Sequence, residues 1–414
     1  MDSKRLIVIG GGAAGFFCAV NAARLNPGLK IIIIEKTNKL LSKVKVSGGG
    51  RCNVTHACFD IAEMSRQYPR GNNFVKKTFH QFFTTDTIHW FEERGVKLKT
   101  EADGRMFPVS DSSQAIIDCL MREVNRYGVE IVMKAEVKSL KYDDKKFRLE
   151  LEGDRHLDSD FICIACGGYP KTEMFDWVRQ TGHSIERPVP SLFTFNMPSH
   201  PIRELMGVAV EKVNIKIAGT SLVQEGPLLI THWGLSGPAV LRLSAWGAKE
   251  LAEKNYEFTI HINWLAEPGY NESKLRETFI DFRVSSPSRK IVSTNFSKLP
   301  QRLWQFLLAQ AGITGDMRFA DFPKKMENLL IRNLVNYEMH VKGKTTFKEE
   351  FVTAGGIRLS EIDPNTMMSK KLANLYFAGE ILDVDGITGG FNFQHAWTSG
   401  FIAGKNIASS YPIT

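Results

Sequence analysis

The stretch Lys4–Glu35, KRLIVIGGGAAGFFCAVNAARLNPGLKIIIIE, decides the fold of this chain. An apolar run at residues 6–9 leads into six small residues, GGGAAG, and a helical pattern follows over residues 16–25. A second apolar run, residues 29–34, stops at Glu35. Apolar runs of this kind, broken by glycine, predict strand, turn, helix and strand in that order, which is the first unit of a parallel α/β sheet.

Three glycines in this stretch have the spacing G-x-G-x-x-G, which is typical of dinucleotide-binding turns. Gly10 permits the tight turn, Gly12 lets a pyrophosphate approach the backbone, and Gly15 lets the helix pack closely on the strand. The free N–H groups at the helix start then face the phosphates. Glu35 follows the last glycine by 20 residues, where an acid can bond a ribose hydroxyl; a glycine turn without a ligand would not explain that acid. The residues predicted to contact the dinucleotide here are Gly10, Gly12, Ala13, Ala14, Gly15, Glu35 and Lys36.

A second glycine cluster, VSGGGRCN, occupies residues 46–53. Successive backbone N–H groups in such a loop can form an anion nest, and Arg51 can add a charged fork. The alternative interpretation is a flexible surface turn without a ligand. The closeness of the two glycine clusters in the sequence favours a second part of one nucleotide site. The residues predicted to belong to it are Lys45, Ser47, Gly48, Gly49, Gly50, Arg51, Cys52 and Asn53.

Length and composition indicate a globular protein of two or three domains. The chain has 414 residues, of which 43% are hydrophobic and 24% charged. Its net charge is +8 and its pI about 9.0, but Lys and Arg are scattered along it. A small anionic ligand such as a pyrophosphate explains this charge better than nucleic acid does, so no nucleic-acid partner is expected.

The sequence has no signal-peptide pattern and no apolar run of membrane-spanning length, so we expect a cytoplasmic protein without a membrane partner. Six cysteines in so long a chain do not indicate a disulfide scaffold. Cys163 and Cys166 spell C-x-x-C. On one strand they would point to opposite faces about 10 Å apart, beyond the reach of a disulfide. No metal site is predicted.

Motifs along the whole chain resemble the bacterial flavoprotein family described as HI0933-like or BaiN-like, also labelled aminoacetone oxidase-like. They are the two glycine clusters, GRMFPVS at residues 104–110, GPLLITHWGLSGP at 226–238, AGGIRLSEID at 354–363 and LYFAGEILDVDGITGGFN at 375–392. The last two are the most specific. The resemblance implies FAD as the cofactor, bound in an extended conformation.

The resemblance also implies cofactor residues outside the two glycine clusters. Val137 would offer backbone contacts beside the adenine, and Gly379 and Glu380 match the element whose acid accepts a hydrogen bond from the ribityl chain. The glycine turn before Phe391 begins a helix whose N-terminus would face the flavin and stabilise negative charge on it. The residues so implied are Val137, Gly379, Glu380, Asp385, Gly390, Phe391 and Asn392.

These patterns predict an α/β fold, a Rossmann-like FAD-binding domain of the two-dinucleotide-binding flavoprotein type with an inserted β-barrel plus helical domain. No second G-x-G-x-x-G exists, so residues 1–190 and 345–414 are predicted to form one discontinuous FAD-binding domain. Short alternating runs followed by helical periodicity assign residues 191–344 to the insert. We also predict one helix over residues 73–94 and a strand over residues 348–353.

We expect an FAD-dependent oxidoreductase that passes hydride from NAD(P)H through the flavin to a small organic acceptor, such as an activated C=C bond. Two alternatives stay open, an amine oxidase of the aminoacetone type and an RNA-modifying flavoprotein. Arg105 is predicted either to face a substrate carboxylate or carbonyl or to be a surface arginine, and His232 either to line the substrate cleft or to be structural. The sequence identifies neither a catalytic residue nor an oligomeric state.

Overall fold

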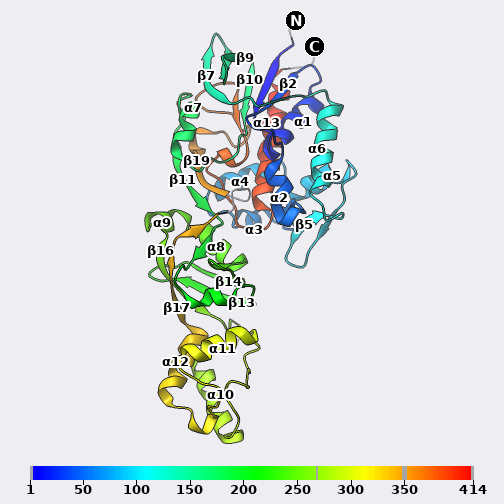
Figure 1. Cartoon of the computed structure of the whole chain (residues 1–414). Coiled ribbons are helices and arrows are strands. Elements are labelled where there is room, and N and C mark those ends of the chain that lie inside the picture. The colour runs from blue at the N-terminus through cyan, green and yellow to red at the C-terminus, as the bar shows by residue number, and fades with distance from the viewer. Residues whose placement is uncertain (1–2, 267–268, 347–351, 412–414) are drawn as a thin grey trace. The chain divides into compact units, whose positions relative to one another are not determined.

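A computed structural model of the chain describes residues 3–266, 269–346 and 352–411. The chain divides into two compact units, one formed by Met1–Ser191 together with Phe347–Thr414, the other by Leu192–Thr346. The first unit contains the parallel sheet and the glycine turn, and the second contains a large antiparallel sheet (Figure 1).

The first unit is built on a parallel sheet with the strand order β20-β10-β1-β2-β6. Its strands are Arg5–Ile9 (β1), Lys30–Glu35 (β2), Glu130–Met133 (β6), Phe161–Ile164 (β10) and Leu375–Phe377 (β20). The central strand β1 is almost entirely buried, which is why its sequence is a continuous apolar run. Because β20 extends the same parallel sheet, its carboxyl end and that of β1 lie at one edge, where ligands bind in such folds.

Two helices of this unit, Ala13–Leu25 (α1) and Phe391–Ser409 (α13), lie side by side (Figure 1). A Cβ at Gly400 would lie 2.5 Å from the carbonyl oxygen of Ala14, and one at Gly404 would lie 2.4 Å from that of Cys18. These two glycines, one turn apart, therefore let the helix backbones touch. The matching order of the contacts makes the helices parallel, so the first turns of α13 extend past the start of α1.

The prediction of a single helix over residues 73–94 is wrong. The structure has two helices there, Asn72–Phe79 (α4) and Thr84–Glu92 (α5). The Asp86 carboxylate accepts a hydrogen bond from the Phe83 N–H at 2.7 Å and so begins the second helix. Buried aromatic residues continue through the break, and the apolar pattern therefore does not reveal it.

The remaining elements of the first unit form three small sheets, β3-β5-β4, β7-β8-β9 and β11-β19, and short helices. Their bounds are Ser42–Gly50 (α2), Thr55–His56 (β3), Ile61–Ser65 (α3), Leu98–Thr100 (β4), Arg105–Pro108 (β5), Gln114–Arg126 (α6), Val137–Asp143 (β7), Lys146–Leu151 (β8), Arg155–Ser159 (β9), Asp176–Arg179 (α7), Ile185–Ser191 (β11) and Val352–Ile357 (β19). The strand predicted over residues 348–353 falls largely outside the described residues, and β19 begins at Val352.

The second unit is a seven-stranded antiparallel sheet with the order β17-β16-β13-β14-β15-β12-β18. Its strands are Thr194–Asn196 (β12), Ala209–Ile217 (β13), Val223–Ile230 (β14), Gly234–Ser236 (β15), Glu257–Asn263 (β16), Tyr337–Lys342 (β17) and Lys344–Thr345 (β18). The two end strands follow each other in the chain through Gly343, whose N–H donates to Tyr256 and whose carbonyl accepts from Asn196. The sheet is thereby closed into a small barrel.

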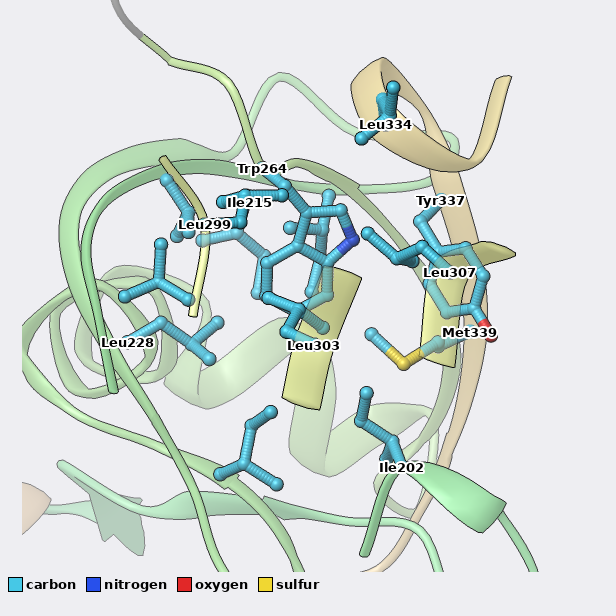
Figure 2. Close-up of a cluster of buried hydrophobic side chains, with 14 of the residues drawn as sticks. Ile202, Ile215, Leu228, Trp264, Leu299, Leu303, Leu307, Leu334, Tyr337 and Met339 are labelled. Atoms are coloured by element: carbon cyan, nitrogen blue, oxygen red, sulfur yellow. The ribbon is translucent and has the colours of Figure 1, made fainter. Parts of the chain in front are cut away.

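Five α-helices lie in the described part of this unit, and their apolar faces share the core of the barrel. They are Pro238–Trp246 (α8), Ala248–Glu253 (α9), Glu272–Ser285 (α10), Gln301–Gln310 (α11) and Lys324–Val335 (α12). Figure 2 shows Trp264, which is 1% exposed, among Leu303 and Leu307 of α11 and Met339 of β17. The barrel and the helices therefore form one hydrophobic core in this unit.

Candidate functional site

The glycine turn between β1 and α1 has the geometry of a nucleotide-binding turn. Gly10 has φ +118°, and a Cβ there would lie 2.4 Å from the carbonyl oxygen of Ala165. A Cβ at Gly15 would lie 2.0 Å from the carbonyl oxygen of Gly10, so only glycine allows this packing. Gly12 differs, because no heavy atom of the described residues lies within 4 Å of its Cβ position. The middle glycine faces open space at the start of α1, where a phosphate would meet free N–H groups.

Glu35 holds this turn in place. Its Oε2 accepts a hydrogen bond from the Gly11 N–H at 3.0 Å, and its Oε1 accepts two from the N–H and hydroxyl of Thr37, each at 2.9 Å. A carboxylate offers about four acceptor positions, so Glu35 keeps capacity for a ribose hydroxyl. The sequence predicted only the contact of Glu35 with a ribose. The structure shows in addition that Glu35 holds the glycine turn through the Gly11 N–H.

A pocket of about 170 Å³ lies beside the turn. It brings together Gly10, Glu35 and Lys36 of the first glycine unit and Val137 of β7. The Lys36 ammonium lies 5.4 Å from the ring centroid of Tyr169, which also lines the pocket. Carboxylates beside aromatic and apolar side chains suit a nucleoside. Cys166, Met174 and Trp177 are further lining residues.

The second glycine cluster forms a loop at the end of α2. Ser47 has ψ 147°, and Gly48, Gly49 and Gly50 have φ of 60°, 69° and 85°. Such a run can direct successive N–H groups toward an anion. A Cβ at Gly48 would lie 2.7 Å from the Phe107 ring, whereas the Cβ positions of Gly49 and Gly50 have no heavy atom of the described residues within 4 Å. The last two glycines therefore keep one side of the loop open.

Arg51 and Arg105 share one cluster of charges. Arg51 donates to the Glu101 carboxylate at 2.5 Å, lies 3.6 Å from the Asp111 carboxylate and stacks over the Phe107 ring at 4.0 Å. Arg105 donates to the other oxygen of Glu101 at 3.1 Å. The fork that the sequence predicted for an anionic ligand is thus engaged by carboxylates, and Arg51 joins the glycine loop to the β4–β5 hairpin.

Two side chains hold the N-terminus of α13. With its amide oxygen toward the helix, Asn53 accepts a hydrogen bond from the Gly390 N–H at 2.9 Å. His56 Nδ1 donates to the Gly389 carbonyl at 3.0 Å, and its ring stacks on Phe391 with centroids 4.7 Å apart. The first N–H groups of α13 have no acceptor within the helix, so this end offers donors and partial positive charge to a ligand.

Two other residues that the resemblance assigned to FAD make internal contacts. The Asn392 amide binds Gly386 twice, accepting from its N–H at 2.8 Å and donating to its carbonyl at 2.9 Å. Asp385 is fully buried, pairs with Arg70 and accepts from the Ser191 hydroxyl at 2.8 Å. Both side chains therefore brace the segment that leads into α13.

Glu380 follows β20 and has polar neighbours from distant parts of the chain. Its carboxylate pairs with the Lys43 ammonium and accepts a hydrogen bond from the Thr353 N–H at 2.9 Å. The Thr353 hydroxyl is buried and has no hydrogen-bond partner among the described residues. A Cβ at Gly168 would lie 2.9 Å from Glu380 Oε1 and 2.4 Å from the Thr353 hydroxyl, so glycine is needed there. An acid beside an unpartnered hydroxyl fits a ligand that carries several hydroxyl groups.

Three further predicted residues have simpler positions. Ala14 lies close to Gly379, and a Cβ added at Gly379 would lie 2.8 Å from the Cβ of Ala14. The small side chain of Ala14 therefore lets the end of β20 pack against α1. The Lys45 side chain is exposed on α2. His232 belongs to the second unit, where it is exposed after β14 with its ring 4.0 Å from that of Trp233.

Sequence reasoning missed Lys43, His56 and His395. Lys43 stands just before the second glycine cluster and pairs with Glu380, and a basic residue at that place is its only sequence signal. His56 and His395 contact backbone carbonyls, of Gly389 and Gly379 respectively. Such contacts depend on residues far apart in the chain and leave no local pattern.

No disulfide links the cysteines in the described part of the chain. All six are free in the described part of the chain, and burial raises the pKa of the Cys52 thiol to about 12 and that of Cys166 to about 11. Over residues 3–266, 269–346 and 352–411, no group of three or more His, Cys, Asp and Glu could hold a metal ion. Within the same residues, no helix has the length and apolarity needed to cross a bilayer.

These features fit an extended FAD. The open side of Gly12, the pocket beside Glu35 and the carboxylate of Glu380 all follow strands of one parallel sheet. The unpartnered Thr353 hydroxyl and the N-terminus of α13 add donors beside them. The glycine turn suits the pyrophosphate, the pocket the nucleoside, Glu380 the ribityl chain, and the N-terminus of α13 the flavin ring.

The family described as HI0933-like protein Rossmann domain matches residues 4–406 of the chain. A 3-dehydro-bile acid delta(4,6)-reductase of Clostridium scindens is 29% identical to it over 413 residues, covering 98% of this chain and 99% of that protein. A ribosomal RNA dihydrouridine synthase of Escherichia coli is 30% identical over 421 residues, covering 99% of each.

Solved structures share the fold at low sequence identity. A 3-ketosteroid-delta4-(5alpha)-dehydrogenase from Rhodococcus jostii superposes with a TM-score of 0.51 at 11% identity, over 98% of this chain and 97% of that one. The predicted fold class, a Rossmann-like FAD-binding domain with additional antiparallel sheets, is confirmed. The family match over nearly the whole chain shows that the protein belongs to the HI0933-like family of FAD-binding Rossmann-type oxidoreductases.

Proposed function

We propose that the protein is a reductase that transfers hydride from NAD(P)H, by way of bound FAD, to a conjugated carbon–carbon double bond. The observation that carries this proposal is the convergence of the open glycine turn, Glu380 and the N-terminus of α13 in one unit. The names of the two relatives support the acceptor, because a delta(4,6)-reductase and a dihydrouridine synthase both add hydrogen across C=C bonds.

The chain's own residues bind and orient the cofactor. Gly12 and the first turn of α1 bind the pyrophosphate, and Glu35 accepts from a ribose hydroxyl while it braces the turn. Lys43 holds the Glu380 carboxylate ready for the ribityl chain. The N–H groups at the start of α13 stabilise negative charge that develops beside them. When bound, FAD would supply the hydride chemistry, with NAD(P)H as the donor and the double bond as the acceptor.

The cysteines support a diffusible electron donor. In the described residues every cysteine is free, and the thiols of Cys52 and Cys166 are kept protonated by burial. A relay through Cys52 or Cys166 is therefore a poor source of electrons for the flavin. Both relatives are named for reductions, which need an electron donor, and we propose NAD(P)H for that role.

A second candidate acceptor is uridine within RNA. The Escherichia coli relative is named for that reaction and matches this chain over its full length. Between Asp281 and Asp316 the second unit has five Lys or Arg residues and no Asp or Glu. A stretch without acids suits a polyanion better than a neutral small molecule.

The test supplies the purified protein with NADPH or NADH and one acceptor at a time, without oxygen. The acceptors are a steroid enone and a transcript of ribosomal RNA, and a small amine in air serves as the contrast. We expect the enone to yield a product heavier by two hydrogens. If only the RNA gains two hydrogens, the second candidate is established. Consumption of the amine without NAD(P)H would overturn both.

A further inference from the structure

Both backbone polar groups of Gly379 are bound by side chains of α13. His395 Nε2 lies 3.3 Å from the Gly379 carbonyl oxygen, and the Gly379 N–H donates to the Ser399 hydroxyl oxygen at 2.9 Å. His395 and Ser399 are four residues apart and so lie one turn apart on the same helix face. Gly379 has φ +74°, and the Cβ of Ala14 confines it from the side of α1.

The hydrogen-bond directions in this arrangement are determined. A carbonyl can only accept, so His395 Nε2 must carry a proton. His395 is 2% exposed, and burial lowers its pKa to about 4, so the ring is neutral at pH 7 with its single N–H directed at Gly379. The Ser399 hydroxyl donates to the His395 carbonyl at 2.6 Å and therefore has a lone pair for the Gly379 N–H.

Gly379 immediately precedes Glu380, whose carboxylate is held on its other side by Lys43 and the Thr353 N–H. The side chain of Glu380 is therefore fixed at its end, while its backbone is fixed through Gly379. A shift of Gly379 would move the carboxylate away from both partners.

We propose that His395 and Ser399 form a clamp that positions Glu380 toward the ribityl chain of FAD. Helix α13 would then contribute to the FAD site at two places. Its N-terminus faces the flavin, and its clamp holds the end of β20 next to Glu380. His395 is a positioning residue, because donating its only proton would break the bond that holds Gly379. The inference rests on the proposed FAD site.

The test compares His395→Leu, which keeps bulk but has no N–H, with His395→Gln, whose terminal amide can reach the Gly379 carbonyl, and His395→Asn, whose amide is too short. Lys405→Ala, exposed on the same helix, is the control. Two quantities are measured on the full-length protein: the dissociation constant of FAD, and the deuterium exchange of peptides spanning Gly379 with and without FAD.

We expect His395→Leu and His395→Asn to weaken FAD binding about tenfold and to speed exchange at Gly379 by a similar factor, as for the loss of one hydrogen bond. His395→Gln should stay within about threefold of the wild type by the same reasoning, and Lys405→Ala should change neither quantity. If His395→Leu does not fold, the comparison of Gln with Asn decides, and equal values for these two would overturn the clamp.

The two proposals fail separately. Absence of FAD binding by the wild-type protein would refute the proposed function, while exchange at Gly379 in the flavin-free variants would still test the clamp. Tight FAD binding with identical exchange in all His395 variants would refute the clamp alone. Ser399→Ala gives an independent reading, because it removes the acceptor of the Gly379 N–H and should speed its exchange with His395 intact.

Discussion

Asn53 and Gly390 are joined by a 2.9 Å hydrogen bond that ties the second glycine cluster to the first turn of α13. The approach is close, because a Cβ at Gly390 would lie 2.5 Å from the carbonyl oxygen of Thr55. Gly390 also has φ +95°, which side-chain-bearing residues rarely adopt. The N-terminal part of the chain thus fixes the helix that the C-terminal part contributes to the site.

Gly390→Ala should destabilise the protein by about 3 kcal/mol, the sum of left-handed strain and a backbone clash. Gly128→Ala is the matched control, because Gly128 has φ +64° but no heavy atom of the described residues within 4 Å of its Cβ position. It should cost only about 1 kcal/mol of strain. Urea unfolding measures both, and equal losses would show that the contact with Thr55 is unimportant.

Gly12→Ala should separate binding from folding. Its φ of −96° is ordinary and its Cβ position is open, so the flavin-free protein should keep its stability within about 0.5 kcal/mol. The methyl group would occupy the approach of the pyrophosphate, and FAD affinity should fall at least about tenfold. Gly15→Ala should instead destabilise the fold by about 2 kcal/mol or more, because its Cβ would meet the Gly10 carbonyl.

Fluorescence titration with FAD, together with urea unfolding of the flavin-free protein, measures this pair of variants. An unchanged FAD affinity of the Gly12→Ala protein would contradict the placement of the pyrophosphate. A Gly15→Ala protein as stable as the wild type would show that the turn can relax.

Asp385→Asn should lower the free energy of unfolding by about 3 kcal/mol, because it breaks the buried ion pair with Arg70. Asp103→Asn, which removes an exposed partner of Arg105, should produce no measurable loss. Chemical denaturation tests the pair. A fully stable Asp385→Asn protein that has lost FAD would instead assign Asp385 to the cofactor, as the sequence resemblance implied.

Stability should fall as the pH is lowered from about 6.5, the pKa of histidine in an unfolded chain, toward 4. Burial lowers the pKa of His395 to about 4 and also lowers that of His183, despite the opposing charge of Glu361. Between these pH values the unfolded chain binds protons that the folded protein excludes, so protonation favours unfolding.

Urea midpoints at pH 7.5 and pH 5 check this expectation. The His395→Gln protein lacks one of the three histidines, His183, His200 and His395, whose pKa burial lowers, and should lose less stability over the same interval. A wild-type protein that is more stable at pH 5 would contradict the assignment of neutral, buried histidines.

The first glycine unit could be predicted because its determinants are local. Gly12 and Gly15 act within one strand, turn and helix, so their spacing specifies the geometry, and the close approach of Gly10 to Ala165 is the exception. The alternating and helical runs of the second unit likewise predict its strands and helices. The helix break near Phe83 was missed because a capping carboxylate sets it while the apolar pattern continues.

Side-chain partners in the site could not be predicted in this way. Arg51 has a side chain that can bind an anionic ligand, but it pairs instead with Glu101 and Asp111 from other parts of the chain. Lys43 meets Glu380 only because folding brings helix α2 to the residues that follow β20. Contacts between residues hundreds of positions apart are set by packing, which no periodicity in one sequence encodes.

We propose that NAD(P)H reduces the FAD of this protein and that the reduced flavin then reduces a conjugated double bond. The most direct test mixes the purified yellow protein with NADH or NADPH without oxygen, follows the flavin absorbance, and then adds a conjugated enone. We expect the absorbance to bleach with the nicotinamide and to return with the enone. Flavin that NADH and NADPH leave oxidised, but that a small amine bleaches, would contradict it.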